Sequence, residues 1–356
     1  MYNRLTSPRD VARALRPLAG VLGNCFFGVV WILRGDLEHF NLELNLPNPN
    51  SNAPCALCPA NTTDRPMHEY RTGRMRWMAD IYSRARFFAT RWCTHAIFHD
   101  VHGGIYSATV FPDWLHTKHL GTDAYFYGSV LWMLVYMLLP GTPQENMNTV
   151  LAEIKTHYTR LAIPYRYQNI KLSMFCDSQD PPGTHPKLKG RGAEIRYVGF
   201  ALQVIWERYM DRSNTQQVQV LVALNASVAA EQILIDHKHC FCFSSDVGRQ
   251  FKNHVFAFLV AFNALGSFYS RVLNVKLFDL TVKAHYLAHL GLIGEYCNPR
   301  LGWAYSGEDL MHHCQRLMSM CCKGTKPLIT AEKFAERYAM GMHLKFVGDT
   351  RRPLLK

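Results

Sequence analysis

The sequence lacks a long uninterrupted hydrophobic run, which argues against a membrane-spanning segment. The longest such run, residues 130–139, is about half the length that a transmembrane helix needs. A second apolar stretch, residues 255–275, is interrupted by Asn263, Arg271 and Asn274. The first ten residues are polar and do not contain the apolar core of a signal peptide. We therefore expect no membrane partner.

Acidic residues are scarce relative to basic ones. The chain has 27 Asp and Glu against 39 Lys and Arg, a formal net charge of +12, and a sequence pI of about 9.2. This balance favours an acidic partner, and nucleic acid is the commonest one. Hydrophobic residues make up 48% and charged residues 19%, which excludes a disordered chain. The 356 residues suffice for one large domain or two ordinary ones.

A disulfide framework and the common nucleotide-binding and hydrolase motifs are also missing. The eleven cysteines are odd in number and scattered, and a chain of this size does not need disulfides to fold. We therefore expect a reducing compartment, the nucleus or the cytosol. The sequence contains no P-loop, no G-x-S-x-G, no dinucleotide fingerprint and no internal repeat.

The most informative stretch is residues 111–121, Phe-Pro-Asp-Trp-Leu-His-Thr-Lys-His-Leu-Gly. A β-branched segment, residues 105–110, precedes it and predicts a strand, while residues 124–139 predict a buried helix. Asp113 thus lies where a strand gives way to a helix, and His116 follows on the same helical face. A carboxylate there suits a hard divalent cation, and His116 and Lys118 suit a phosphate. The alternative is that Asp113 only caps the helix.

A second carboxylate has the same context. Residues 25–33 are rich in aromatic and β-branched side chains and predict a buried strand that ends at Gly35. A helix is predicted to resume at residues 37–46. Asp36 therefore repeats the position of Asp113 at the end of a strand.

Two cysteines at C-x-x-C spacing, Cys55 and Cys58, can supply half of a tetrahedral zinc site. We expect the other half to come from the ligand-rich residues 92–102, with Cys93 and His95 as the preferred ligands and His68, His99 and His102 as alternatives. Two ordinary, partly buried thiols remain the competing interpretation. His285 and His289 lie four residues apart on one helical face but lack the glutamate of a zinc-protease motif, so that reaction class is excluded.

Basic residues cluster in two places that can contact a nucleic acid. Arginines alternate with aromatic residues over 71–91, and a glycine-containing segment over 187–196 leads into a helix. For residues 71–91 there is an alternative interpretation, which is a helix with one solvated basic face and one packed aromatic face. The expected phosphate contacts are Lys118, Lys187, Lys189, Arg191, Arg196, Arg74 and Arg76.

These motifs follow one another in a distinctive order. The order is Gly35-Asp36, Pro54-Cys-x-x-Cys58, an Arg- and Trp-rich span, Asp113-x-x-His116-x-Lys118, a long helical stretch, Lys283-Ala-His-Tyr-Leu-Ala-His-Leu290 and an acidic helix at Glu308. It resembles the catalytic region of eukaryotic cut-and-paste transposases of the CACTA (En/Spm) type, whose relatives include the KDZ and hAT groups. The resemblance spans roughly residues 26–320 through motif order rather than continuous similarity.

The resemblance implies an α/β, mostly helical chain with an RNase H-like fold, a mixed five-stranded sheet interrupted by a long α-helical insertion. Sites of this family hold two Mg²⁺ or Mn²⁺ ions between carboxylates and cleave and join DNA strands. Asp113 matches the second acid, Glu308 the third with Asp309 as a substitute, and His116 the motif histidine. The family's first acid lies on an earlier strand, so Asp36 is its only local replacement.

The same resemblance predicts how the chain is divided. Residues 1–122 are expected to hold the first part of the core with the Cys-x-x-Cys insertion, and residues 123–296 the helical insertion. Residues 297–345 are expected to be C-terminal helices with the acidic residue, and residues 346–356 a basic tail.

The sequence thus predicts a transposon-derived DNA-binding protein with a phosphoryl-transfer site. The missing first acid suggests an N-terminally incomplete or domesticated chain and leaves open whether the chain catalyses a reaction. The sequence also leaves open whether the chain forms a homo-oligomer. The alternative is a non-catalytic, zinc-stabilised nucleic-acid-binding or scaffold module whose acids serve only as helix caps.

Overall fold

The computed structural model describes residues 32–90, 92, 98, 106–177, 180–322 and 327–351, without the side chains of residues 306–309, 327–328 and 344–351. The chain divides into two compact units, Met1–Trp303 and Ala304–Lys356. Most of the strand predicted at residues 25–33, together with Cys93 and His95, lies outside the described residues.

The sheet of the first unit is small. Its two strands, β1 (Leu33–Gly35) and β2 (Val110–Pro112), run parallel, and Gly35 pairs with Pro112 at their carboxyl ends. Across the part of the chain that is described, the sheet has two strands. The mostly helical α/β class is therefore confirmed, and the five-stranded RNase H-like sheet stays a prediction.

A helix follows each strand. Asp36 caps α2 (Leu37–Leu44), which buries Leu37, Phe40 and Leu44 at helical spacing. After β2, the π-helix η2 (Leu115–Asp123) continues into α6 (Ala124–Met133) and a second π-helix, η3 (Leu134–Leu138). The predicted helices at residues 37–46 and 124–139 are thus confirmed, with small differences at their ends.

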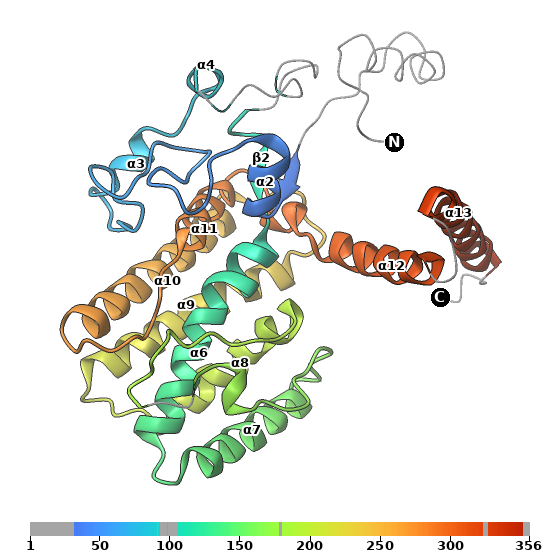
Figure 1. Ribbon diagram of the computed structural model, residues 1–356. Coiled ribbons are helices and arrows are strands. Elements are labelled where there is room, and N and C mark those ends of the chain that lie inside the picture. The colour runs from blue at the N-terminus through green and yellow to red at the C-terminus, as the bar shows by residue number, and fades with distance from the viewer. Residues whose placement is uncertain are drawn as a thin grey trace. The chain divides into compact units, whose positions relative to one another are not determined.

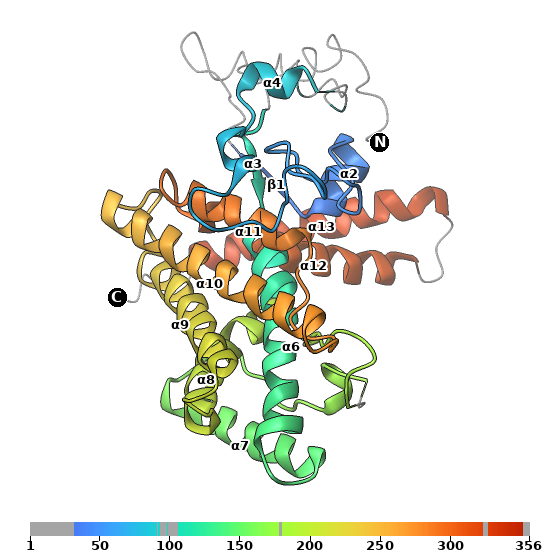
Figure 2. The same cartoon turned by 90° about the vertical axis from the view of Figure 1, so that its left-hand side faces the viewer.

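Long helices surround α6. They are α7 (Pro143–Arg160), α8 (Gly192–Tyr209), α9 (Thr215–Asp236), α10 (Ser245–Arg271) and α11 (Val282–Ile293); shorter turns are α3 (Arg76–Ala79), α4 (Arg84–Phe88), η4 (Leu172–Met174) and η5 (Pro299–Gly302). In both ribbon views, β2 and α2 lie at one end of α6 and α7 at the other (Figures 1 and 2). The described residues within 123–296 are mainly helical, and their role as an insertion stays a prediction.

The apolar sequence of α6 explains its central place. Nine of its ten residues are buried, and a helix that is hydrophobic on all sides must be covered on all sides. Phe126 packs edge-to-face on Phe258 and Phe262 of α10, at centroid distances of 5.2 and 5.4 Å. These aromatic contacts, each worth about 0.5–1.5 kcal/mol beyond burial, join the two helices.

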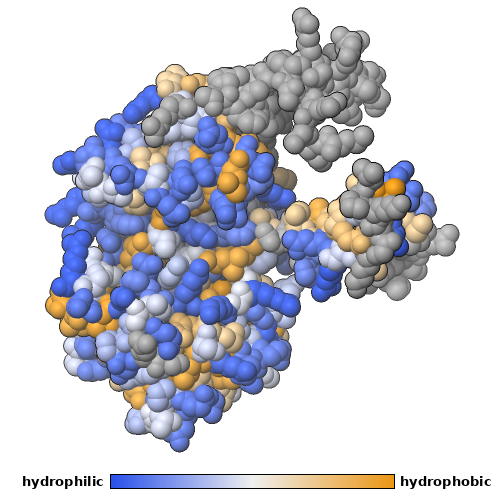
Figure 3. Space-filling model, viewed as in Figure 1, coloured by the Kyte–Doolittle hydropathy of each residue, from blue (hydrophilic) through white to orange (hydrophobic). Residues whose placement is uncertain are grey.

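One helix, α9, is long and apolar enough to cross a bilayer by length and composition, among the residues searched. Half of its most apolar window is buried inside the protein, and core helices pass the same test. The face drawn in Figure 3 shows apolar patches scattered between hydrophilic residues of the first unit.

The second unit contains α12 (Tyr305–Cys322) and α13 (Pro327–Arg351), which contact each other. Glu308 and Asp309 lie in the first turns of α12.

Candidate metal centre and strand-end acidic pair

Two cysteines and two histidines meet in the interior of the first unit. Their ligand atoms all lie within 4.8 Å of one another, and all four residues are buried. Cys58 Sγ lies 3.3 Å from His285 Nε2, and Cys55 Sγ lies 3.4 Å from His289 Nε2. The two sulfur atoms are 3.6 Å apart, and the two Nε2 atoms are 3.2 Å apart.

Local structure brings the two halves of this cluster together. The spacing of His285 and His289 places both imidazoles on one face of α11. Tyr286, between them, accepts a hydrogen bond from Ala56 N (3.0 Å) and donates one to Pro54 O (3.1 Å), which attaches the cysteine loop to α11. Within the loop, Leu57 N–H donates to Cys55 Sγ at 3.3 Å.

The surroundings orient the ligand atoms. His285 Nδ1 lies 2.9 Å from Met67 O, and because a carbonyl only accepts, the proton is on Nδ1. The lone pair of Nε2 therefore faces the sulfur atoms, as in metal-ligating histidines held by a backbone carbonyl. Trp77 covers both imidazoles, with centroids 4.7 Å from His285 and 5.0 Å from His289.

The cluster's electrostatics differ between the thiols. Burial opposes ionisation of Cys55, but its hydrogen bond with Cys58 and its electrostatic interactions with His289 and His285 hold its pKa below the usual value. Burial and neighbouring Cys55 raise the pKa of Cys58. Burial also lowers the pKa of His289, which favours the neutral imidazole that binds metals.

The donor set fits one class of ion. Two sulfur and two imidazole nitrogen donors make a closed tetrahedral Cys2His2 set, the set of structural zinc sites. The buried group can therefore hold a metal such as zinc.

The expectation that Cys55 and Cys58 face further ligands is supported, and the prediction that Cys93 and His95 are among those ligands stays untested. Within the described residues, His285 and His289 meet the thiols, whereas Cys93 and His95 lie outside the described residues. A usable signal was present, because C-x2-C with a distant H-x3-H is a Cys2His2 spacing. His285 and His289 are not among the ligands predicted from the sequence.

Asp36 and Asp113 occupy equivalent positions at the ends of the two strands. Each follows one member of the Gly35–Pro112 pair, so the two residues emerge side by side at the same edge of the sheet. Asp36 Oδ1 accepts from His39 N at 2.7 Å. Asp113, which is buried, accepts from Leu115 N at 3.1 Å and His116 N at 3.0 Å.

His116 also contacts the Asp113 carboxylate through its side chain, with Nδ1 at 2.5 Å from Oδ2. Both acids therefore cap helices, as the alternative interpretation expects. At Asp113 both carboxylate oxygens have contacts, Oδ1 with Leu115 N and Oδ2 with His116 N and His116 Nδ1, so a cation there would have to share these oxygens with the cap.

A lysine from α11 lies close to this pair. A Cβ added to Gly121 of η2 would stand 2.8 Å from Lys283 Cδ, so glycine at 121 makes room for the lysine stem. Burial and Lys187 lower the pKa of Lys283, whereas the charges of Asp36 and Asp113 act in the opposite direction. Helix α11 thus places the Lys283 stem against Gly121 of η2 and, further along, His285 and His289 against the thiols.

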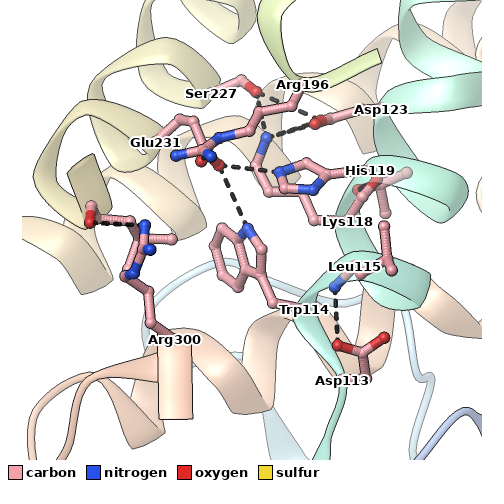
Figure 4. Close-up of polar contacts among 12 residues, drawn as sticks. Asp113, Trp114, Leu115, Lys118, His119, Asp123, Arg196, Ser227, Glu231 and Arg300 are labelled. Atoms are coloured by element: carbon pink, nitrogen blue, oxygen red, sulfur yellow. Dashed lines mark hydrogen bonds and ion pairs between the residues drawn. The ribbon is translucent and has the colours of Figure 1, made fainter. Parts of the chain in front are cut away.

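Further along η2 from Asp113, a buried ion pair holds this helix in place. Lys118 Nζ lies 2.8 and 2.6 Å from the Asp123 carboxylate oxygens and 2.8 Å from Ser227 Oγ of α9 (Figure 4). The Lys118 side chain is 2% exposed. Our expectation that Lys118 contacts phosphate is therefore not met in this structure, because its ammonium is enclosed and paired.

A second buried group adjoins it around Glu231. His119 Nε2 and Trp114 Nε1 lie 3.0 and 3.3 Å from Glu231 Oε2, and Arg196 forms an ion pair with Oε1 (Figure 4). Arg196, a second expected phosphate contact, is thus committed to Glu231. The other five expected contacts are exposed: Lys187, Lys189, Arg191, Arg74 and Arg76.

Glu308 and Asp309, the expected third acid and its substitute, belong to α12 of the second unit. Their side chains lie outside the described residues, so their role stays a prediction.

The chain matches no protein-family model, and no curated protein and no solved structure matched it.

Proposed function

We propose that this chain is a transposon-derived DNA-binding protein whose strand-end acids form an RNase H-like phosphoryl-transfer site. The observation that carries the proposal is the register of the two parallel strands, which sets Asp36 beside Asp113. Carboxylates at adjacent strand ends are the oxygen donors that Mg²⁺ and Mn²⁺ prefer. Glu308 is the proposed third acid, and a nuclear location follows from the DNA substrate.

The reaction class is phosphodiester hydrolysis or strand transfer. A water or 3′-hydroxyl oxygen bonds to phosphorus, the P–O3′ bond breaks, and the departing oxygen takes up a proton. Bound divalent ions supply Lewis acidity and charge neutralisation. Among the chain's own groups, Asp36 and Asp113 would hold the ions, His116 would orient Asp113 through its 2.5 Å contact, and Lys283 would supply positive charge towards the phosphate.

The Cys2His2 group has a structural role in this proposal. It joins the loop around Cys55 to α11, and α11 also carries Lys283. Zinc binding would therefore fix the position of Lys283 relative to Asp36 and Asp113. Closed four-ligand sites stabilise folds, whereas catalytic zinc sites keep a position open.

The exposed cations favour electrostatic binding of DNA. Lys187, Lys189 and Arg191 lie close together in sequence at the start of α8, and all three are exposed. Their enclosed counterparts Lys118 and Arg196 are not part of the proposed surface.

A second candidate is a zinc-stabilised nucleic-acid-binding module without catalysis. It is favoured by the observation that Asp36 and Asp113 both already cap helices. Both candidates predict DNA binding, and only the first predicts cleavage.

One pair of measurements tests both candidates. Duplex DNA binding, measured at a series of salt concentrations, should weaken steeply with salt. The Lys187→Ala, Lys189→Ala and Arg191→Ala variants should each lower the salt slope by about one unit, whereas Lys155→Ala, an exposed lysine on α7, should not. Absence of binding at low salt would contradict both candidates.

Cleavage is measured on the same DNA. With Mn²⁺, the wild type should nick supercoiled plasmid, and Asp113→Asn should not. Binding without nicking by the wild type would favour the non-catalytic module.

A further inference from the structure

A cavity of about 570 Å³, lined by both apolar and uncharged polar residues, lies beside α2 and is not used by either site above. Asn41 and Asn45 come from the end of α2, and the loop that follows supplies most of the remaining wall. Trp92 provides an aromatic surface. The lining residues are Asn41, Asn45, Leu46, Pro47, Asn48, Ser51, Asn52, Ala53 and Trp92.

Several polar groups in this wall are available to a ligand. The indole N–H of Trp92 is buried and has no hydrogen-bond partner among the described residues, a condition that buried donors rarely tolerate. The side-chain amides of Asn45 and Asn52 also have no partner among the described residues. Asn41 donates its amide to Leu46 O at 2.7 Å, which leaves its side-chain oxygen as an acceptor.

These groups define the chemistry of the ligand. Among the described residues, the lining contains no charged side chain, which favours an uncharged ligand group. Asparagine amides offer both donors and acceptors, and an indole offers a flat surface and one donor. A planar, neutral ring with donors and acceptors on its edge matches both properties. Nucleobases have this chemistry, and proteins hold unpaired bases by aromatic stacking and amide hydrogen bonds.

We propose that this cavity binds one unpaired base of a DNA strand. The position supports this ligand, because the same short helix connects the cavity to the acidic pair. Asp36 caps the first turn of α2, and Asn41 and Asn45 lie roughly 8 and 14 Å further along the helix axis at about 1.5 Å per residue. The choice of DNA as the source of the base rests on the proposed function.

The test compares two single-stranded oligonucleotides of equal length. One carries a base at every position, and the other is abasic at its central positions, so both have the same phosphates. By fluorescence anisotropy, the wild type should bind the base-bearing strand about 10-fold more tightly, as expected for stacking and hydrogen bonding of one base. Trp92→Ala and the double variant Asn45→Ala/Asn52→Ala should lose this preference and keep the affinity for the abasic strand.

Two further variants separate the contributions. Trp92→Phe keeps a stacking surface without the N–H and should retain part of the preference. Asn148→Ala, an exposed asparagine on α7, should retain all of it. Equal wild-type affinity for the two strands would overturn the base pocket while leaving DNA binding intact.

If neither strand binds, the proposed function fails. Saturation-transfer NMR with free deoxynucleosides then tests whether the cavity binds a base on its own. Signals in the wild type that disappear in Asn45→Ala/Asn52→Ala would support the pocket. If a methyl glucoside gives saturation-transfer signals and the nucleosides do not, the cavity is a sugar site and the base pocket is overturned.

Discussion

His285 Nε2 lies 3.3 Å from Cys58 Sγ, although 227 residues separate the two in the sequence. The contact closes a long loop, and metal ions that close long loops can stabilise a fold strongly. It also connects the loop around Cys55 to the helix that carries Lys283.

The first prediction concerns zinc. Purified protein should contain about one zinc per chain, and Cys58→Ser and His285→Ala should both reduce the zinc content and lower the melting temperature, because each removes one of four ligands. Cys240→Ser and His239→Ala, at exposed positions, serve as controls and should leave both unchanged. Metal analysis and thermal melting measure the two quantities. A metal-free wild type of equal stability would contradict the zinc site.

The second prediction concerns divalent ions at the acidic pair. Mn²⁺ should raise the melting temperature of the wild type by about 2 °C or more and should have no effect on Asp113→Asn or Asp36→Asn. Asparagine caps a helix nearly as well as aspartate, so these variants remove a metal ligand with little effect on the cap. Asp211→Asn, an exposed loop position, is the matched control and should keep the Mn²⁺ shift. A wild type without a shift would favour acids that act only as caps.

The third prediction concerns the buried ion pair under Asp113. Lys118→Met should lower the free energy of unfolding by about 3–5 kcal/mol, because it leaves the Asp123 carboxylate buried without its cation. The double variant Lys118→Met/Asp123→Asn should lose less than Lys118→Met alone. Urea unfolding provides the values. Arg212 and Glu207 form an exposed ion pair that serves as the control, and Arg212→Met should lower the free energy of unfolding by about 1 kcal/mol or less. An equally small loss for Lys118→Met would contradict the conclusion that Lys118 and Asp123 form an enclosed pair.

The fourth prediction concerns acid. Burial opposes ionisation of Glu231, but Arg196, His119 and Lys118 outweigh it and hold its pKa below the usual 4.5. Since the folded-state pKa is the lower one, Glu231 stabilises the fold above about pH 4.5, and this contribution is lost as the pH falls further. Glu231→Gln should therefore be less stable than the wild type at pH 7, and the difference should narrow in acid. Urea unfolding at several pH values measures how this difference in the free energy of unfolding narrows. For Glu207→Gln, at an exposed position, the free energy of unfolding should change with pH in the same way as for the wild type.

Local features of the fold were predictable from the sequence because their causes are local. The apolar run of residues 124–139 predicted a buried helix, and it forms α6 with the π-helix η3. Asp36 and Asp113 were placed at strand ends with helices following, because caps and β-branched runs act within a few residues. The C-x-x-C spacing likewise indicated metal ligands before their partners were known.

Other features were decided only by the tertiary structure, because they depend on residues far apart in the chain. The sequence does not specify which histidines approach Cys55 and Cys58, and packing of α11 against the cysteine loop selects His285 and His289. The pairing of β1 with β2 places Asp36 beside Asp113 across 77 positions of sequence (113 − 36). Burial also decides what a charged residue can bind. In the sequence, Lys118 cannot be distinguished from an exposed lysine that contacts phosphate. In the structure its ammonium is enclosed and therefore needs a counter-ion, which Asp123 provides.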